Sequence, residues 1–205
     1  MKAAVLVDGG YLRVLSRKAG HAYDPDFIER VALSCVDAGV ERMLKVLYYD
    51  CAPYTGTQNQ PVSGAPTTWS GNDQWLSDLS RRDYFAVRRG VLKFRGYKLK
   101  RIPYQPTRPR VDADFEPVFE QKGVDMRIGL DIASMSEKEI VDRVILVTGD
   151  TDCIPAMKHA RKAGVQVVLI QLPNAHLAQE LLSHTDLKRT IGWPGGLAAV
   201  AGEMN

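Results

Sequence analysis

The chain has 205 residues, of which 45% are hydrophobic and 25% charged, and its net charge is +3. These values are typical of a globular protein and suffice for one domain with a substantial core. No apolar run approaches the roughly 18 residues of a membrane span. The apolar start is too short for a signal peptide, and the three widely spaced cysteines form neither a disulfide framework nor a zinc pattern. We therefore expect a cytoplasmic protein with no membrane partner.

The first 50 residues predict two buried strands with a helix between them. Residues 2–7 are mostly apolar, which predicts a strand, and Asp8-Gly9-Gly10-Tyr11 follows at its carboxyl end. Asp8 in this place fits either a helix N-cap or a ligand-binding carboxylate. A helix is expected over residues 24–38, because Pro25 suits a first helical turn. The next strand is expected over residues 43–49.

The middle of the chain is predicted to be an insertion over about residues 54–118. Its first part is rich in Thr, Gly, Pro, Ser, Gln and Asn and lacks periodicity, which predicts an irregular, mobile excursion. Alternating residues further on predict a hairpin. The expected segments are an excursion over 54–71, a helix over 72–85, a hairpin over 87–99 that turns at Arg95-Gly96, and a surface connection over 103–117.

Positive charge is concentrated between Arg81 and Arg110. This stretch holds eleven Lys or Arg and one acid, so it carries about +10, whereas the rest of the chain sums to about −7. Lysine and arginine neutralise phosphates with release of counterions, and interleaved aromatic rings stack on unpaired bases. The alternative is a solvated basic face whose aromatics fill the core. We favour a nucleic-acid partner contacted by Arg88, Arg89, Lys93, Arg95, Lys98, Lys100 and Arg101.

The second half of the chain alternates helices and strands. Val144–Val147 is apolar and mostly β-branched, which is typical of a strand buried on both faces of a parallel sheet. The chain is therefore expected to be an α/β domain over residues 1–190, followed by a Gly/Ala-rich tail over 191–205. The predicted elements are a helix from Lys122-Gly123-Val124-Asp125 to about Ser136, helices over 152–163 and 174–184, and strands over 143–148 and 165–170.

Four aspartates are predicted to meet at the carboxyl edge of this sheet, where open α/β sheets bind ligands. Asp8 and Asp150 follow strands that should be neighbours, and the helix that begins near Asp125 leads into the second of them. Carboxylates without nitrogen or thiolate ligands suit Mg²⁺ or Mn²⁺ rather than zinc. A metal beside a basic surface indicates a phosphodiester substrate. The predicted metal ligands are Asp8, Asp125, Asp150 and Asp152.

Two other aspartates are interpreted as secondary. Asp50 lies near the end of the second strand but is followed by a loop sequence. Asp131 lies six residues after Asp125, about 240° further round a helix, so the two cannot share one face. Asp131 is therefore expected to be a structural or supporting residue.

Three segments in order resemble the NYN domain of the PIN-like nuclease superfamily, which includes the LabA/DUF88 group. They are Asp8-Gly9-Gly10-Tyr11, then Lys122-Gly123-Val124-Asp125 with Asp131, and Val147-Thr148-Gly149-Asp150-Thr151-Asp152. The similarity runs from about residue 2 to residue 188.

This resemblance implies a Rossmann-like, three-layer α/β/α PIN-like domain with a mostly parallel sheet. It also implies a metal-dependent endoribonuclease that uses Mg²⁺ or Mn²⁺, with Asp8, Asp125, Asp150 and Asp152 as catalytic residues and single-stranded RNA as partner. Tyr11 stands where many members carry Asn, so we expect Tyr11 to contact RNA in a different way.

Two other functions are kept open. The first is a non-catalytic RNA-binding or regulatory module on the same fold, against which the retention of four acids argues. The second is a phosphatase or nucleotide-binding α/β protein, which the absence of Asp-x-Asp after the first strand and of a Walker-type loop disfavours. A homo-oligomer is compatible with the sequence.

Overall fold

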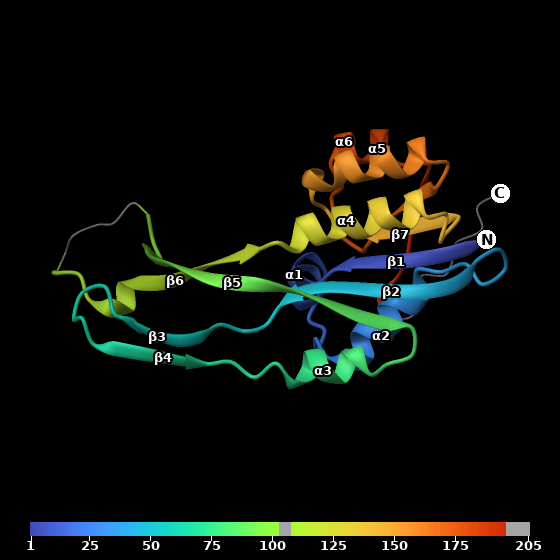
Figure 1. Ribbon diagram of the computed structural model, residues 1–205. Coiled ribbons are helices and arrows are strands. Elements are labelled where there is room, and N and C mark those ends of the chain that lie inside the picture. Colours follow the sequence, from blue (N-terminus) through green and yellow to red (C-terminus); the bar gives the residue numbers. More distant parts are fainter. Residues whose placement is uncertain (103–107, 196–205) are drawn as a thin grey trace, which may run out of the picture.

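The structure is a computed structural model that describes residues 1–102 and 108–195 (Figure 1). Its sheet has the strand order β6-β5-β2-β1-β7-β8-β9, and all neighbours are parallel except β5 and β6. These strands are β1 (Lys2–Asp8), β2 (Arg42–Cys51), β5 (Phe85–Leu99), β6 (Phe115–Lys122), β7 (Arg143–Val147), β8 (Gln166–Gln171) and β9 (Leu187–Thr190). The helices are α1 (Gly9–Lys18), α2 (Pro25–Ser34), α3 (Gln74–Ser80), α4 (Val124–Glu137), α5 (Ile154–Lys162) and α6 (Gln179–Ser183), with short 3-10 turns η1 (Asp112–Asp114) and η2 (Thr151–Cys153). Among the described residues, none of the helices has the length and apolar character to cross a membrane.

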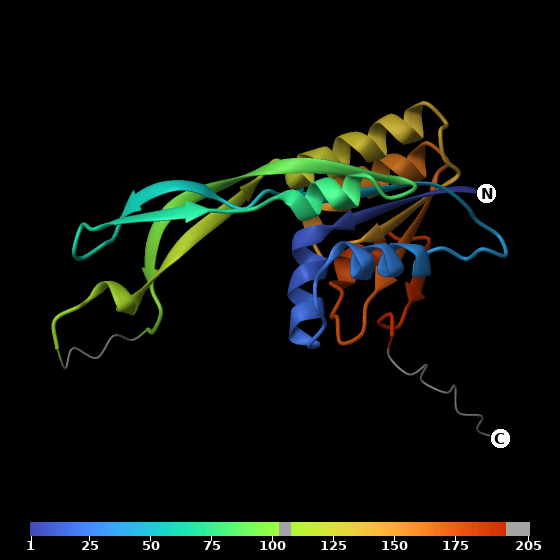
Figure 2. The same cartoon turned by 90° about the horizontal axis from the view of Figure 1, so that it is seen from below.

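Helices cover both faces of the sheet (Figures 1 and 2). Val5 and Val7 of β1 pack in a core with α1, α2 and α3, whereas Ala4 and Leu6 pack in a second core with α4, α5 and α6. Successive side chains of a strand point to opposite faces, so a strand covered on both sides is apolar throughout. The predicted three-layer α/β/α fold with a mostly parallel sheet is confirmed.

Several element boundaries differ from the sequence-based expectation. The helices expected over 24–38, 72–85 and 174–184 are shorter, and α1 and β9 were not expected. The first of these helices stops at Ser34, because the Asp37 side chain accepts a hydrogen bond from Gly39 N (3.0 Å) and so favours a turn. Helix α1 begins with two glycines, which are poor helix formers, and β9 carries charged residues.

The prediction of an irregular, mobile excursion over residues 54–71 is wrong. This segment forms a β-hairpin of β3 (Thr55–Asn59) and β4 (Pro66–Ser70). The Thr57 and Thr68 hydroxyls bond across it at 2.8 Å. Its strand pattern is hidden in the sequence because small polar residues occupy most positions on both faces, and Trp69 on β4 supplies the main apolar contact.

The prediction of a hairpin over residues 87–99 is also wrong. Strand β5 continues through this region, and Arg95-Gly96 forms an irregularity in the pairing between Phe94 and Tyr97. Gly96 has φ +99°, a conformation that favours glycine. The partner of β5 is β6, which begins at Phe115 inside the connection expected over 103–117. Residues 103–107 and the tail residues 196–205 lie outside the described part.

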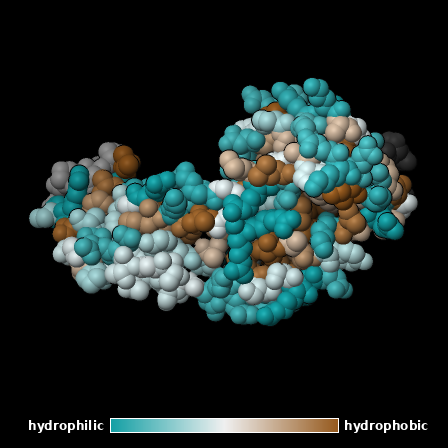
Figure 3. All heavy atoms as spheres, viewed as in Figure 1, coloured by the Kyte–Doolittle hydropathy of each residue, from teal (hydrophilic) through white to brown (hydrophobic). Residues whose placement is uncertain are grey.

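We call residues 54–71, 91–102 and 108–122 the arm. The arm extends away from the carboxyl edge of the parallel strands (Figures 1 and 2). Five rings hold its two sheets together, with neighbouring centroids 5.2 to 6.2 Å apart: Tyr54, Trp69, Phe94, Tyr97 and Phe119. Residues 52–72 contain no charged side chain, and Figure 3 shows this part of the arm as pale rather than teal.

A buried carboxylate, Glu41, links strands at the amino ends of the parallel sheet, opposite the arm. Glu41 accepts hydrogen bonds from Arg189 on β9 at 2.8 and 3.0 Å and from Arg143 on β7. Its side chain is 0% exposed. Burial alone would raise the pKa of Glu41, but the hydrogen bonds from Arg189 and Arg143 outweigh it and lower the pKa to about 2. This network holds the edge strand β9.

We expect Glu41→Gln to lower the free energy of unfolding by about 3 kcal/mol, because it leaves two partly or fully buried guanidiniums without a counter-charge. The measurement is urea unfolding at pH 7, with the exposed Glu180→Gln as control. A carboxylate with a lowered pKa stabilises the fold above the unfolded pKa of about 4.3. The difference between wild type and variant should therefore shrink as the pH falls from about 4 towards 2. An equal loss in both variants would contradict this role.

Candidate metal centre

The carboxyl ends of β1 and β7 lie side by side, because these strands pair in parallel with Val7 opposite Val147. Asp8 ends β1 and caps α1, since its Oδ1 accepts from Tyr11 N at 3.1 Å. Asp150 follows β7 and caps η2, since its Oδ1 accepts from Asp152 N at 2.9 Å. Asp8 is therefore a helix cap, and it lies at the carboxyl edge of the sheet, where open α/β sheets bind ligands.

Three of the four predicted ligands lie together. Asp125, Asp150 and Asp152 each offer a carboxylate oxygen, and these oxygens lie within 4.8 Å of one another. Asp125 reaches this point because Gly123, with φ +78°, turns the end of β6 into the first turn of α4. A set of carboxylate oxygens at this spacing fits the ligand preference of Mg²⁺ or Mn²⁺.

Asp8 lies beside this group rather than in it. It lines the same hollow as Asp125 and Asp150, which we call the acidic pocket. Gly10, Tyr11 and Gln121 also line it. Thr148 Oγ1 lies 3.4 Å from Asp8 Oδ2 and completes the hydrogen bonding of this carboxylate.

The acidic pocket disfavours negative charge. Burial chiefly raises the pKa of Asp8 to about 6, with the charges of Asp125 and Asp150 adding to it, although hydrogen bonds from Tyr11 N and Thr148 oppose the shift. Burial, then Asp150 and Asp152, also raise the pKa of Asp125. A divalent cation among these groups would relieve both effects.

Asp131 and Asp50 are held by other groups. Asp131 accepts hydrogen bonds from Tyr49 and from Arg88, each at 2.9 Å, so it supports the contact of α4 with β2 and β5. Asp50 is fully buried at the end of β2 and forms an ion pair with Arg13 of α1 at 2.8 Å.

Sequence reasoning missed Gln121, which reaches the acidic pocket from β6 and donates to Asp50 Oδ1 at 3.2 Å. A polar residue beside Lys122-Gly123-Val124-Asp125 was the signal available. Its direction depends on how β6 pairs, which the local pattern does not reveal.

Four of the residues expected to contact nucleic acid form ion pairs within the protein. Arg88 pairs with Asp131, and the other three pairs are Arg89 with Asp73 (2.5 Å), Arg95 with Glu120, and Lys98 with Glu116 (3.2 Å). Lys93, Lys100 and Arg101 are exposed and form no ion pair with residues that the structure describes.

Tyr11 packs its ring against Gly149, where an added Cβ would lie 2.6 Å from a ring carbon. Its hydroxyl is buried and has no hydrogen-bond partner within the described part of the chain. Tyr11 therefore shapes one wall of the acidic pocket.

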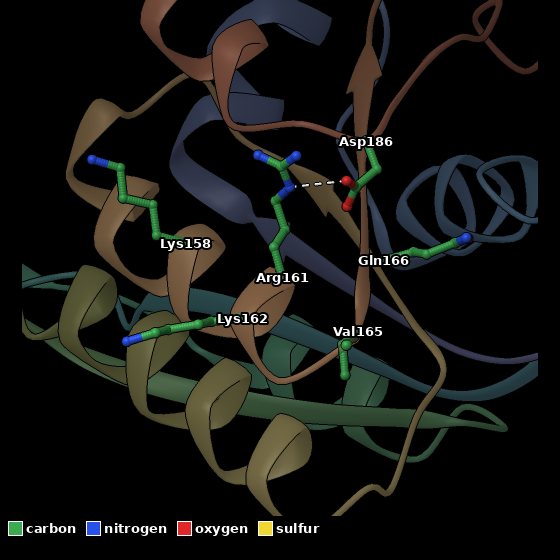
Figure 4. Close-up of a pocket in the computed structure, with 7 residues that line it drawn as sticks. Lys158, Arg161, Lys162, Val165, Gln166 and Asp186 are labelled. Atoms are coloured by element: carbon green, nitrogen blue, oxygen red, sulfur yellow. Dashed lines mark hydrogen bonds and ion pairs between the residues drawn. The ribbon is translucent and has the colours of Figure 1, made fainter.

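A second hollow lies at the opposite edge of the sheet, where α5 ends and β8 begins (Figure 4). Its lysines point outwards, and Arg161 pairs with Asp186 at 2.9 Å. With a single carboxylate that is already paired, this hollow lacks the ligand set of the acidic pocket.

We expect Asp8→Asn to stabilise the metal-free protein above pH 6. In the unfolded chain Asp8 ionises near pH 4, whereas in the folded chain it ionises near pH 6. Its ionisation therefore costs nothing below pH 4 and destabilises the fold by on the order of 2 to 3 kcal/mol above pH 6. Asn preserves the helix cap.

The measurement is thermal unfolding in EDTA at pH 4.5 and at pH 7.5. Asp8→Asn should raise the melting temperature clearly at pH 7.5 only. Asp24→Asn is the matched control, because Asp24 caps α2 through Phe27 N (2.8 Å) and is exposed. A stabilisation of the same size in both variants would contradict the effect of burial.

The model of the NYN domain family matches residues 68–191, a region that includes Asp125, Asp150 and Asp152. Among solved structures, the chain is similar to a protein of unknown function from Vibrio parahaemolyticus. The two are 20% identical with a TM-score of 0.53, over 93% of this chain and 92% of that chain, and at this identity the likeness concerns the fold. No curated protein matches the chain. From the match over more than half of its length, the chain belongs to the NYN domain family of the PIN-like superfamily.

Proposed function

We propose that this protein is a Mg²⁺- or Mn²⁺-dependent endoribonuclease that hydrolyses phosphodiester bonds of single-stranded RNA in the cytoplasm. The observation that carries the proposal is the group of Asp125, Asp150 and Asp152 within 4.8 Å, in a chain of the NYN family. NYN and PIN-like nucleases typically use divalent metal at acidic sites, and their domains generally bind RNA.

Each acidic residue has a role in this proposal. Asp125, Asp150 and Asp152 would hold the cation, and Asp8 would add negative charge from the neighbouring strand end. When bound, the cation supplies positive charge that stabilises the transition state of phosphodiester hydrolysis and lowers the pKa of nearby water. Tyr11 N and Thr148 keep the Asp8 carboxylate in place through their hydrogen bonds.

The arm is proposed to hold the RNA. It extends from the same edge of the sheet as the acidic pocket (Figures 1 and 2). Lys93, Lys100 and Arg101 carry exposed charge on it. Arg88, Arg89, Arg95 and Lys98, already paired with acids, would contribute less, because an ion-paired cation must give up its carboxylate to meet a phosphate.

We expect Asp150→Asn to lower RNA cleavage by about 100-fold or more while leaving the fold and RNA binding intact. Asn retains the side-chain oxygen that caps η2 but removes the ligand charge. Labelled single-stranded RNA is incubated with purified protein and Mn²⁺ or Mg²⁺, and an EDTA sample should lose activity to the same extent.

The matched control is Asp83→Asn, since Asp83 is exposed and lies outside the acidic pocket. Cleavage by Asp150→Asn at the wild-type rate would refute the assignment of Asp150. RNA binding without cleavage by the wild type would indicate the non-catalytic binding module instead.

We expect the triple variant Lys93→Ala/Lys100→Ala/Arg101→Ala to weaken RNA binding. Each lost phosphate contact should reduce the slope of log K against log salt by about 0.7, so the slope should fall by about 2. Filter binding or fluorescence anisotropy over a salt series measures both slope and affinity.

The control is Lys98→Ala/Glu116→Ala, which removes one ion pair without changing the net charge of the arm. Its affinity and salt slope should stay near the wild-type values. Equal losses in both variants would indicate that the arm matters through its structure rather than through free charge.

A further inference from the structure

Gln121 places an amide in the acidic pocket next to carboxylates. Its Oε1 lies 3.1 Å from the point where a Cβ on Gly10 would stand, and Asp8 Oδ1 lies 3.4 Å from the same point. Any residue larger than glycine at position 10 would fill this space. The amide oxygen and the Asp8 carboxylate thus face one small volume beside the start of α1.

A buried ion pair fixes the direction of the Gln121 amide. Asp50 is fully buried and accepts hydrogen bonds from Arg13 at 2.8 and 3.1 Å and from Tyr48 at 2.9 Å. It also accepts from Gln121 Nε2 at 3.2 Å. An ionised carboxylate only accepts, so the NH₂ of the amide must face Asp50 and the oxygen must face away.

The Gln121 oxygen is available to a ligand. Within residues 1–102 and 108–195 no donor reaches Oε1, although Gln121 is half-buried and lines the acidic pocket. The pocket therefore presents a neutral acceptor whose orientation is set by the protein before any ligand binds. The cation is assigned to the group of Asp125, Asp150 and Asp152. Any other group that enters beside Gln121 must donate a hydrogen bond, because the amide oxygen and the Asp8 carboxylate both repel acceptors.

This requirement selects one part of a nucleic-acid backbone. Phosphate oxygens and the bridging sugar oxygens only accept hydrogen bonds, whereas the ribose 2′-hydroxyl donates, and this hydroxyl distinguishes RNA from DNA. Beside Gln121 the negative charge of Asp8 disfavours a phosphate oxygen, whereas a cation held by Asp125, Asp150 and Asp152 would attract one. Because Asp125 and Asp150 line the same pocket, this hydroxyl would belong to a nucleotide next to the scissile phosphate.

We propose that Gln121 accepts a hydrogen bond from a ribose 2′-hydroxyl and thereby makes the acidic pocket prefer RNA over DNA. This inference rests on the proposed ribonuclease function and adds a specificity-determining residue to it. The Asp50–Arg13 ion pair acts through Gln121 by holding its amide in one orientation.

The test combines a protein substitution with a substrate substitution. Gln121→Met keeps the length of the side chain and removes the acceptor. RNA oligonucleotides carry a 2′-fluoro group at the nucleotide on either side of the mapped cleavage position, which removes the donor while retaining an RNA-like sugar. Single-turnover cleavage and RNA affinity are measured for the wild type and Gln121→Met on the unmodified RNA and on each of the two 2′-fluoro RNAs, which makes six combinations. Gln74→Met, at an exposed position of α3, is the matched control.

For the wild type and Gln74→Met, we expect the 2′-fluoro group at one of the two nucleotides to lower cleavage about tenfold. For Gln121→Met, we expect cleavage of unmodified RNA to fall by about the same factor, with little further loss on the 2′-fluoro substrate. Such non-additivity is the mark of two groups in contact. Unchanged melting temperatures exclude a loss through misfolding.

Two results would overturn the inference. One is a full 2′-fluoro penalty in Gln121→Met, which would place the acceptor elsewhere. The other is a wild type that cleaves the 2′-fluoro and the unmodified RNAs at the same rate, together with a Gln121→Met variant that cleaves all of them more slowly. This result would indicate that the amide binds water and not the ribose. If the wild type cleaves no RNA, the ribonuclease proposal fails, and the same comparison in RNA affinity decides the role of Gln121. A chain that also fails to bind RNA refutes both.

Discussion

Parallel pairing of β1 with β7 is the constraint on which the acidic pocket depends. Both strands are buried on both faces, so their apolar residues hold the strand ends at a common edge. Asp8 and Asp150 follow these ends and cannot move apart without disturbing two hydrophobic cores. The free energy of packing thus keeps carboxylates together that would separate in water. The pKa of Asp8 rises to about 6 chiefly because this group is buried, and the charges of Asp125 and Asp150 add to the shift.

Two carboxylates at opposite ends of the parallel strands, Glu41 and Asp8, have opposite electrostatic surroundings. At one end Glu41 lies between Arg143 and Arg189, and its pKa falls to about 2. At the other end, the hydrogen-bond partners of Asp8 within the described residues are a backbone N–H and a hydroxyl. The first arrangement is complete within the protein. The second leaves negative charge without compensation, which is the condition under which a protein site binds a cation.

The number of Lys and Arg residues in the arm overstates the positive charge that the arm presents to a ligand. The half-buried rings of Phe94 and Tyr97 pack against each other, and Phe94 also packs against Trp69, so these ring contacts lie within the arm. Acidic residues of β6 stand opposite several cations of β5, with Glu116 paired to Lys98 and Glu120 to Arg95. The free positive charge of the arm is therefore smaller and more localised than the count of Lys and Arg indicates.

The sequence by itself determined the strands that lead to Asp8 and Asp150, the helix that begins near Asp125, and the NYN family, because apolar runs and local motifs report burial and turns directly. Only the tertiary structure decided that residues 54–71 form a hairpin, that β5 runs through Arg95-Gly96 to pair with β6, and that Gln121 enters the acidic pocket. Each of these depends on contacts between segments far apart in the chain. Local periodicity indicates which side of a helix or strand is buried. Which other helix or strand covers that side depends on the packing of the whole fold.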